Sequence, residues 1–261
     1  MENWTSMLHL ASRVLEASPL LPFLFVWLQR NTIPRQFKLV QYYVLAEAFF
    51  YVLTTISRPV FRNDAYVTHI STVVAVWLLA HTYRRLLAST RLKRSIAAGI
   101  GVFLAIAFVD AAILSEGFTY LNSYSQAFGS AFLIALALLH ILQISRTSLY
   151  LENQAEFFLS ITTLIYFAYT IVTYVTTNLI YHSNYDVPTR IQLDRIISAP
   201  DALLYAVHMG LLAWMFSFFP LSVDPLRALP HWLHYSRWHP RPYRLLGQNL
   251  LRQHWATTTV S

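Results

Sequence analysis

The 261-residue sequence contains no cysteine and few charged residues, and each shortage excludes a group of proteins. Without cysteine there is no thiol nucleophile, no thiolate-bound metal and no disulfide-stapled secreted module. Charged residues make up 12% of the chain, about half the roughly 25% that is usual in soluble domains. Hydrophobic residues make up 56% of the chain, including the 15% that are aromatic. Together with a mean hydropathy of +0.44, this composition excludes disorder and a collagen or coiled-coil rod. We therefore predict an all-α, polytopic membrane protein.

Other absences narrow the type of membrane protein. The two lysines, Lys38 and Lys93, fall in predicted loops, so no lysine in the last helix is present to form a retinal Schiff base. His208 is not followed by a second histidine four residues later, as it is in seven-helix zinc hydrolases of the adiponectin-receptor and alkaline-ceramidase type. Ser130 lacks the GxSG setting of a rhomboid nucleophile. No Walker motif, selectivity-filter sequence or internal repeat is present, and the paired broken helices of inverted-repeat transporters are missing.

Apolar runs of spanning length recur along most of the chain. A bilayer core of about 30 Å needs a helix of roughly 17–25 residues. Six runs meet this length, and turn signals such as Arg58-Pro59 and Asn122-Ser123 lie between them. These predicted spans are Leu39–Ser57, Tyr66–Tyr83, Ser95–Leu114, Gln126–Ser145, Phe157–Tyr181 and Ala202–Leu221.

The segment 1–31 admits two interpretations. Its apolar part, Ala17–Leu28, is too short to cross alone and contains two prolines. Extended back to Trp4 it is long enough, but it then carries three polar residues on one helical face. These are His9, Arg13 and Glu16. The segment is either a first spanning helix whose polar stripe faces the bundle or an amphipathic surface helix. We adopt the first, which gives a seven-helix bundle over residues 1–222.

The distribution of basic residues predicts the orientation. Fourteen of the 19 lysines and arginines lie on one side of the predicted bundle and five on the other. The rich side comprises Gln29–Lys38, Arg84–Arg94, Arg146–Glu156 and everything after Val223. By the positive-inside rule the C-terminus is cytoplasmic, and with seven spans the N-terminus lies outside. The predicted location is the plasma membrane, which in a bacterium is the inner membrane.

Residues 223–261 form a predicted cytoplasmic tail. It contains five arginines and four histidines interleaved with aromatic residues, namely Trp232, Tyr235, Trp238, Tyr243 and Trp255. Amphipathic aromatics and long cationic side chains suit the lipid headgroup layer. The tail is therefore a membrane-surface element or, alternatively, a disordered tail without a role. It is too short for a kinase or nucleotide-binding domain, so any cytoplasmic output requires a separate partner.

Ionisable residues at membrane depth are candidates for function because burying them in lipid is costly. His69, Asp110 and His208 lie on three helices at roughly 5–11 Å from the predicted outer boundary, at ~1.5 Å per residue. We expect them to line one outward-opening pocket, with Glu47 below them near the midplane. The alternative is structural, with both carboxyl groups neutral or paired with hydroxyls and His69 at the wet interface.

Three further ionisable residues have simpler interpretations. Asp201 follows Pro200 and is predicted to be a helix-start residue that complements the helix dipole. His81 and His140 lie near the predicted inner ends of their helices. They form either a separate pair or two interfacial side chains.

Two imidazoles and a carboxylate from three helices could hold zinc, which makes His69, Asp110 and His208 weak metal candidates. None of them belongs to a local HxxxH or HExxH motif, however. We therefore expect no metal and no other cofactor.

Several stretches resemble an uncharacterised family of small seven-helix integral membrane proteins common in Bacteroidetes. The resemblance covers residues 36–222 and is carried by Tyr66–Ile70, Tyr83–Leu87, Phe118–Tyr124, Tyr166–Tyr169 and Tyr205–His208. A Tyr-x-x-Glu step typical of the family is absent, because Ser71–Ala75 contains no carboxylate. The resemblance implies the seven-helix fold and an association with signalling components. It also draws attention to Tyr66, His69, Tyr124 and His208, so that the predicted ligand pocket comprises Glu47, Tyr66, His69, Asp110, Tyr124, Tyr205 and His208.

Three classes of function remain open, besides a purely structural subunit. The favoured hypothesis is a receptor-like or regulatory protein that senses a small molecule, a lipid or the state of the membrane and signals to a separate partner. Its partner or lipid surface would be the basic cluster Arg84, Arg85, Arg91, Lys93 and Arg94, which could instead be a topology anchor. The alternatives are a channel, transporter or pore-forming effector, and a lipid-acting enzyme using His69, Asp110 and His208. No feature indicates nucleic-acid binding.

Overall fold

The computed structural model describes residues 14–29, 32–61, 65–114, 123–146, 154–181 and 200–219, with isolated positions at 183, 186, 189–190, 192–193 and 197. Within these ranges the regular secondary structure is entirely helical, which confirms the predicted all-α class there. The predicted tail at 223–261, and the polar stripe residues His9 and Arg13, lie outside the described residues.

The helices correspond to the predicted spans. In chain order they are α2 (Leu20–Gln29), the 3₁₀ helix η1 (Arg35–Phe37), α3 (Lys38–Phe61), α4 (Ala65–Leu86), α5 (Thr90–Val109), the π-helix η2 (Asp110–Leu114), α6 (Ser123–Arg146), α7 (Gln154–Tyr181) and α9 (Asp201–Ser217). As predicted, α9 begins at Asp201.

Among the described residues, five helical stretches are long and apolar enough to cross a membrane, and they correspond to α3, α4, α5, α6 and α7. Two further apolar helices are shorter, at Val14–Gln29 and Asp201–Ser217. The 17 residues of α9 span only about 25 Å at 1.5 Å per residue, against a bilayer core of about 30 Å. The helix ends before Leu221, where the predicted span ended.

Two further helix boundaries differ from the sequence-based prediction by four or five residues. The turn signal Arg58-Pro59 does not end its helix, because α3 continues to Phe61. Pro59 removes one hydrogen bond, to the carbonyl of Thr55, and its ring crowds that carbonyl, but only Val60 and Phe61 of the helix follow it. At the other boundary, α5 starts at Thr90 rather than Ser95. The reason is Ser89, whose side chain accepts a hydrogen bond from the backbone N–H of Leu92 and so caps the helix.

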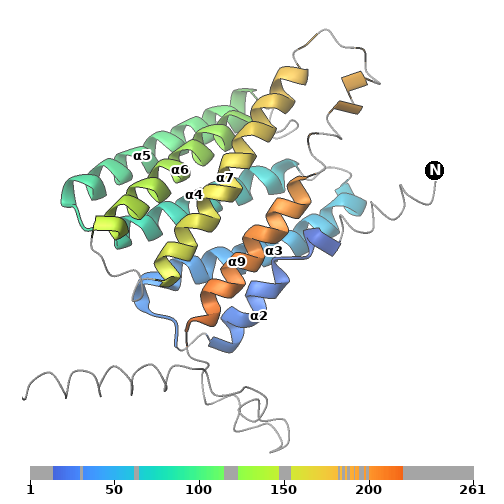
Figure 1. Cartoon of the computed structure of the whole chain (residues 1–261). Coiled ribbons are helices and arrows are strands. Elements are labelled where there is room, and N and C mark those ends of the chain that lie inside the picture. Colours follow the sequence, from blue (N-terminus) through green and yellow to red (C-terminus); the bar gives the residue numbers. More distant parts are fainter. Residues whose placement is uncertain are drawn as a thin grey trace, which may run out of the picture. The chain divides into compact units, whose positions relative to one another are not determined.

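The helices pack as a ring with one helix added to it. Contacts run from α2 to α3, from α3 to α4, from α4 to α6, from α6 to α7, from α7 to α9, and from α9 back to α2. The remaining helix, α5, packs on α4 and α6 (Figure 1). This arrangement creates two distinct interiors, one enclosed by the ring and one between α4, α5 and α6.

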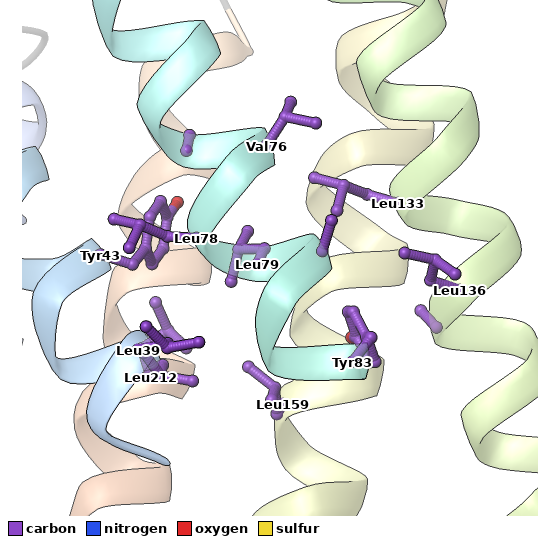
Figure 2. Packing of buried hydrophobic residues seen from close by; sticks show 14 of the residues in the cluster. Leu39, Tyr43, Val76, Leu78, Leu79, Tyr83, Leu133, Leu136, Leu159 and Leu212 are labelled. Carbon is purple, nitrogen blue, oxygen red and sulfur yellow. The ribbon is translucent and has the colours of Figure 1, made fainter. Parts of the chain in front are cut away.

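The apolar core fills the ring and continues to α5, where Ile100 and Phe103 belong to the same buried cluster. Figure 2 shows how side chains from different helices meet there, with Tyr43 from α3, Leu79 from α4 and Leu212 from α9 all fully buried. The outer faces also carry large apolar residues, for example Phe49 and Phe108, which are strongly exposed. A helix that is apolar on both faces suits a lipid environment on its outer side.

Candidate functional site

The best-defined polar site lies inside the ring and is centred on His208 of α9. The side-chain hydroxyl of Thr162 lies 2.9 Å from His208 Nδ1 and also donates to the His208 carbonyl at 3.2 Å. His208 Nδ1 lies 3.2 Å from the Thr162 carbonyl, which can only accept a hydrogen bond. In the neutral ring Nδ1 therefore carries the hydrogen. Nε2 is left to accept from the hydroxyl of Tyr43, 3.0 Å away.

A second interhelical hydrogen bond lies next to the first. The hydroxyl of Tyr205 on α9 donates to Glu47 Oε2 on α3 at 2.7 Å. Glu47 follows Tyr43 by four residues, and His208 follows Tyr205 by three, so each pair lies on one face of its helix. The same two faces of α3 and α9 thus meet at two levels. This contact also agrees with the sequence-based alternative in which Glu47 pairs with a hydroxyl.

Aromatic rings from α7 enclose the site. The ring of Tyr166 stacks on the imidazole of His208, with a centroid separation of 4.6 Å and an interplanar angle of 23°. It also contacts the ring of Tyr205 at 5.7 Å. We call this group of six side chains the His208 cluster, and it consists of Tyr43, Glu47, Thr162, Tyr166, Tyr205 and His208.

Sequence reasoning missed three members of the cluster, namely Tyr43, Thr162 and Tyr166. The spacing of Tyr43 and Glu47 was a usable signal. It places a tyrosine and an ionisable residue on one face of a helix, as the spacing of Tyr205 and His208 does on another predicted helix. Thr162 and Tyr166 are also four residues apart. Such spacing shows that residues share a face, but not which neighbouring helix that face meets.

Asp110 lies in a different place. Its side chain is almost fully buried, and Oδ2 accepts a hydrogen bond of 2.8 Å from the backbone N–H of Ser125. Ser125 is in the first turn of α6, where backbone N–H groups lack partners within the helix and the helix dipole is positive. A carboxyl group there stabilises the start of α6, which is a structural role.

His69 lines a cavity of about 310 Å³ between α4, α5 and α6. Ser125 is the other polar residue at its wall, and the rest is apolar: Ile70, Val73, Val74, Leu104, Ala107, Phe108 and Ala111. No member of the His208 cluster lines this cavity. The residues expected to share one outward-opening pocket are thus divided between two interhelical sites, with Glu47, Tyr205 and His208 in one and His69 in the other.

Tyr66 and Tyr124 belong to neither site. The hydroxyl of Tyr66 hydrogen-bonds Ser57 Oγ at 2.6 Å, which joins α4 to α3 near their connection. Tyr124 is half-exposed at the start of α6. Across the described ranges, no three His, Asp or Glu side chains are placed to share a metal ion, and this includes His69, Asp110 and His208.

The two histidines near the predicted inner ends have separate partners. His140 is fully buried, with Nδ1 2.8 Å from Ser160 Oγ and Nε2 3.4 Å from Glu156 Oε2. His81 bonds the carbonyl of Trp77 in its own helix at 2.9 Å, and its ring contacts the Trp77 ring at an interplanar angle of 42°. His140 therefore links α6 to α7, whereas His81 does not link two helices through these contacts.

The basic cluster occupies the connection between α4 and α5. Arg84 and Arg85 end α4, while Arg91, Lys93 and Arg94 lie at the start of α5. Gln143 of α6 holds the connection in place by accepting from the Ala88 N–H at 3.0 Å and donating to the Leu86 carbonyl at 3.3 Å. The four arginines are exposed and Lys93 is half-buried.

Comparison of the chain with protein-family models, with curated proteins and with solved structures gives no match. The resemblance to the seven-helix family of Bacteroidetes stays a prediction.

Proposed function

We propose that the chain is a seven-helix integral membrane protein of the plasma membrane, with its N-terminus outside and its C-terminus in the cytoplasm. Five helices of spanning length support the membrane location. The pairing of α2 with α9 supports the two additional crossings, since the two shorter apolar helices pack on one another. Gln29 at the end of α2 donates to the Phe219 carbonyl at 3.1 Å, so the two helices end at the same level. The asymmetry of basic residues supports the orientation.

Reporter fusions after residues 31, 93, 185 and 261 test this topology. We expect cytoplasmic signals at 31, 93 and 261 and an external signal at 185. A cytoplasmic signal at 185 or an external signal at 261 would contradict the orientation. An external signal at 31 would contradict the orientation as well, because residue 31 precedes α3 on the cytoplasmic side whether or not the first segment crosses.

Within this topology we propose a receptor-like or regulatory role, in which the His208 cluster senses a small molecule, a lipid or the state of the membrane. The observation that carries the proposal is the bonding of His208, which joins α9 to α3 through Nε2 and to α7 through Nδ1. One ring therefore holds three helices in register. A ligand or proton that competes for either nitrogen would remove a contact between two helices, and this is how a local event changes helix packing.

The proposed output surface is the basic cluster. Arg91, Lys93 and Arg94 lie in the first turns of α5, where the helix dipole is positive and each cation costs roughly 0.3–1 kcal/mol. The stability of α5 therefore does not account for their presence. A surface that meets anionic lipid or an acidic partner does account for it, and the ordered α4–α5 connection presents these side chains on a defined turn.

The test combines the sensor and the output surface. Full-length protein is captured from its native membranes as wild type, as Arg91→Gln/Lys93→Gln/Arg94→Gln, and as His208→Gln, and the co-purifying proteins are identified. We expect one partner to be retained by the wild type and lost from the triple variant, which should still insert because Arg84 and Arg85 remain. The His208→Gln variant should change the amount of the same partner.

Liposomes that contain the wild-type protein alone provide the decisive contrast. Ion flux, measured with an entrapped dye, would contradict the receptor hypothesis and support the channel or transporter hypothesis. Release of fatty acid or headgroup would favour the enzyme. Either activity in the absence of a partner contradicts the proposal.

A further inference from the structure

The cavity between α4, α5 and α6 is not used by the proposed sensor. We infer that it binds one acyl chain of a membrane phospholipid, with the ester end of the chain at His69 and Ser125. This inference depends on the membrane location but not on the signalling role of the His208 cluster.

The size of the cavity suits a hydrocarbon chain. Its volume is about 310 Å³, whereas an engineered apolar cavity of about 150 Å³ is enough for a molecule of benzene. Roughly a dozen chain carbons therefore fit. A water-filled cavity is less favourable, because water needs two to four polar partners and the wall offers mainly aliphatic and aromatic carbon.

The polar and apolar parts of the wall are ordered along the helices. His69 is in the second turn of α4 and Ser125 is in the first turn of α6, so both lie at the predicted outer end. Val73 and Val74 lie a further turn into the bundle. On α5 and η2, which run in the opposite direction, Leu104 lies about two turns deeper than Ala111. A phospholipid has the same order, with polar ester groups at the interface and hydrocarbon towards the midplane.

The mouth of the cavity opens on the outer face of the bundle, which lipid would cover in a membrane. Ile70 is 47% exposed, Leu104 40% and Phe108 73%, although all three line the cavity. Apolar side chains at an opening would be unfavourable against water but are expected against hydrocarbon. The cavity is therefore continuous with the outer apolar face of the bundle, and a chain can enter it sideways from the bilayer.

The charge near the polar end favours an ester over a free carboxylate. The carboxyl group of Asp110 accepts from the backbone of Ser125, which is itself at the cavity wall. A fatty acid would bring a second carboxyl group next to this one, and two carboxyl groups that both carried a charge in a medium of low dielectric constant would repel strongly. An ester carbonyl is neutral and can accept a hydrogen bond from an imidazole or a hydroxyl.

The test uses photoreactive lipid. Purified full-length protein is reconstituted in phosphatidylethanolamine–phosphatidylglycerol vesicles that contain a trace of phosphatidylcholine with a diazirine in one acyl chain. After illumination the labelled peptides are mapped by mass spectrometry. We expect label concentrated on the peptides that contain residues 69–74 and 104–111. A parallel sample receives the free diazirine fatty acid, and there we expect little label at these peptides.

Two matched variants separate cavity binding from general contact with lipid. Ala107→Leu fills the cavity, whereas Ala105→Leu adds the same atoms to an exposed position of α5 that does not line it. We expect Ala107→Leu to lower the label about tenfold, the change that follows from a loss of about 1.4 kcal/mol in affinity, and Ala105→Leu to change it less than twofold. Should Ala107→Leu fail to fold, judged by circular dichroism, Leu104→Trp narrows the partly exposed mouth instead.

Three outcomes would overturn the inference. The first is label spread evenly over all exposed apolar faces, including that around Leu179. The second is equal labelling of the Ala107→Leu and Ala105→Leu variants. The third is stronger labelling by the free fatty acid than by the phospholipid. None of these outcomes affects capture of a partner by the basic cluster, so the two proposals fail independently.

Discussion

His69 and His208 lie at similar predicted depths, but their surroundings differ in kind. His208 is enclosed by the ring, stacks on Tyr166 and uses both nitrogens to bind other helices. His69 is also buried, yet it lines a cavity that opens towards the outer apolar face. Depth in a membrane helix thus predicts that a histidine is buried. Whether it becomes part of a closed network or of an open site depends on which neighbours its helix face meets.

We expect the two regions to have different roles. A closed network with every member bonded resists change until one bond is replaced, which suits a switch. An open apolar cavity accepts a ligand without disturbing the helices around it, which suits a lipid site. The following substitutions test whether the two regions differ in this way.

The largest effect is expected for His208→Ala. The change leaves a cavity and removes the partners of Tyr43 and Thr162, so we expect a loss of about 3 kcal/mol in the free energy of unfolding. Unfolding in mixed micelles measures it. His81→Ala is the matched control, since the His81 ring is half-exposed and bonds its own helix, and it should cost less than about 1 kcal/mol. Equal losses would show that His208 contributes no more to the free energy of unfolding than the half-exposed His81 does.

The second effect concerns the packing of α6 against α4 and α5. A Cβ atom at Gly129 would lie 2.8 Å from Val76 and 3.0 Å from Phe103, so these helices depend on close contact there. We expect Gly129→Ala to cost about 2 kcal/mol through overpacking. Gly101→Ala is the control, because nothing lies within 4 Å of its Cβ position. It should be neutral or stabilise α5 by up to about 1 kcal/mol. A neutral Gly129→Ala would imply looser packing than the structure shows.

A third, smaller effect is expected for Tyr205→Phe. This change removes the 2.7 Å hydrogen bond to Glu47 and leaves the ring in place. Interhelical hydrogen bonds in membrane proteins average about 0.6 kcal/mol and reach about 1.7, and a carboxyl acceptor places this one near the upper end. Tyr124→Phe, at a half-exposed position, should change stability by less than about 0.5 kcal/mol. A thermal unfolding series in detergent compares the pair, and a silent Tyr205→Phe would argue against the Glu47 contact.

The smallest effect is expected beside the α4–α5–α6 cavity. Thr72 donates to Gln126 Oε1 at 2.6 Å and so links α4 to α6. Thr72→Val keeps the shape of the side chain and should cost about 0.6 kcal/mol. Thr55→Val serves as the control, because Thr55 is exposed and bonds the Tyr51 carbonyl of its own helix. If Thr72→Val exceeded His208→Ala, the contrast between the two regions would be reversed.

Much of the fold could be predicted because the length of an apolar run can be read directly along the sequence. The runs that became α4, α6 and α7 were located to within a few residues, since a spanning helix satisfies its backbone hydrogen bonds internally whatever surrounds it. The boundary at Arg58-Pro59 was misplaced by four residues, because α3 continues two residues past the proline despite the lost hydrogen bond. Asp201 was correctly placed at the start of its helix, as a carboxyl group at a helix N-terminus is favourable by itself.

The sequence by itself determined the helical class and the approximate extent of the long apolar helices. It also predicted the depths of Glu47, His69, Asp110 and His208, because a fixed rise per residue converts position in a span into depth. The tertiary structure decided their partners. Rotation about each helix axis and the order of the helices placed His208 against Tyr43 and Thr162, Asp110 against the start of α6, and His69 at the cavity between α4, α5 and α6. Those partners depend on contacts between residues far apart in the chain, and a pattern within one helix carries no information about the helix next to it.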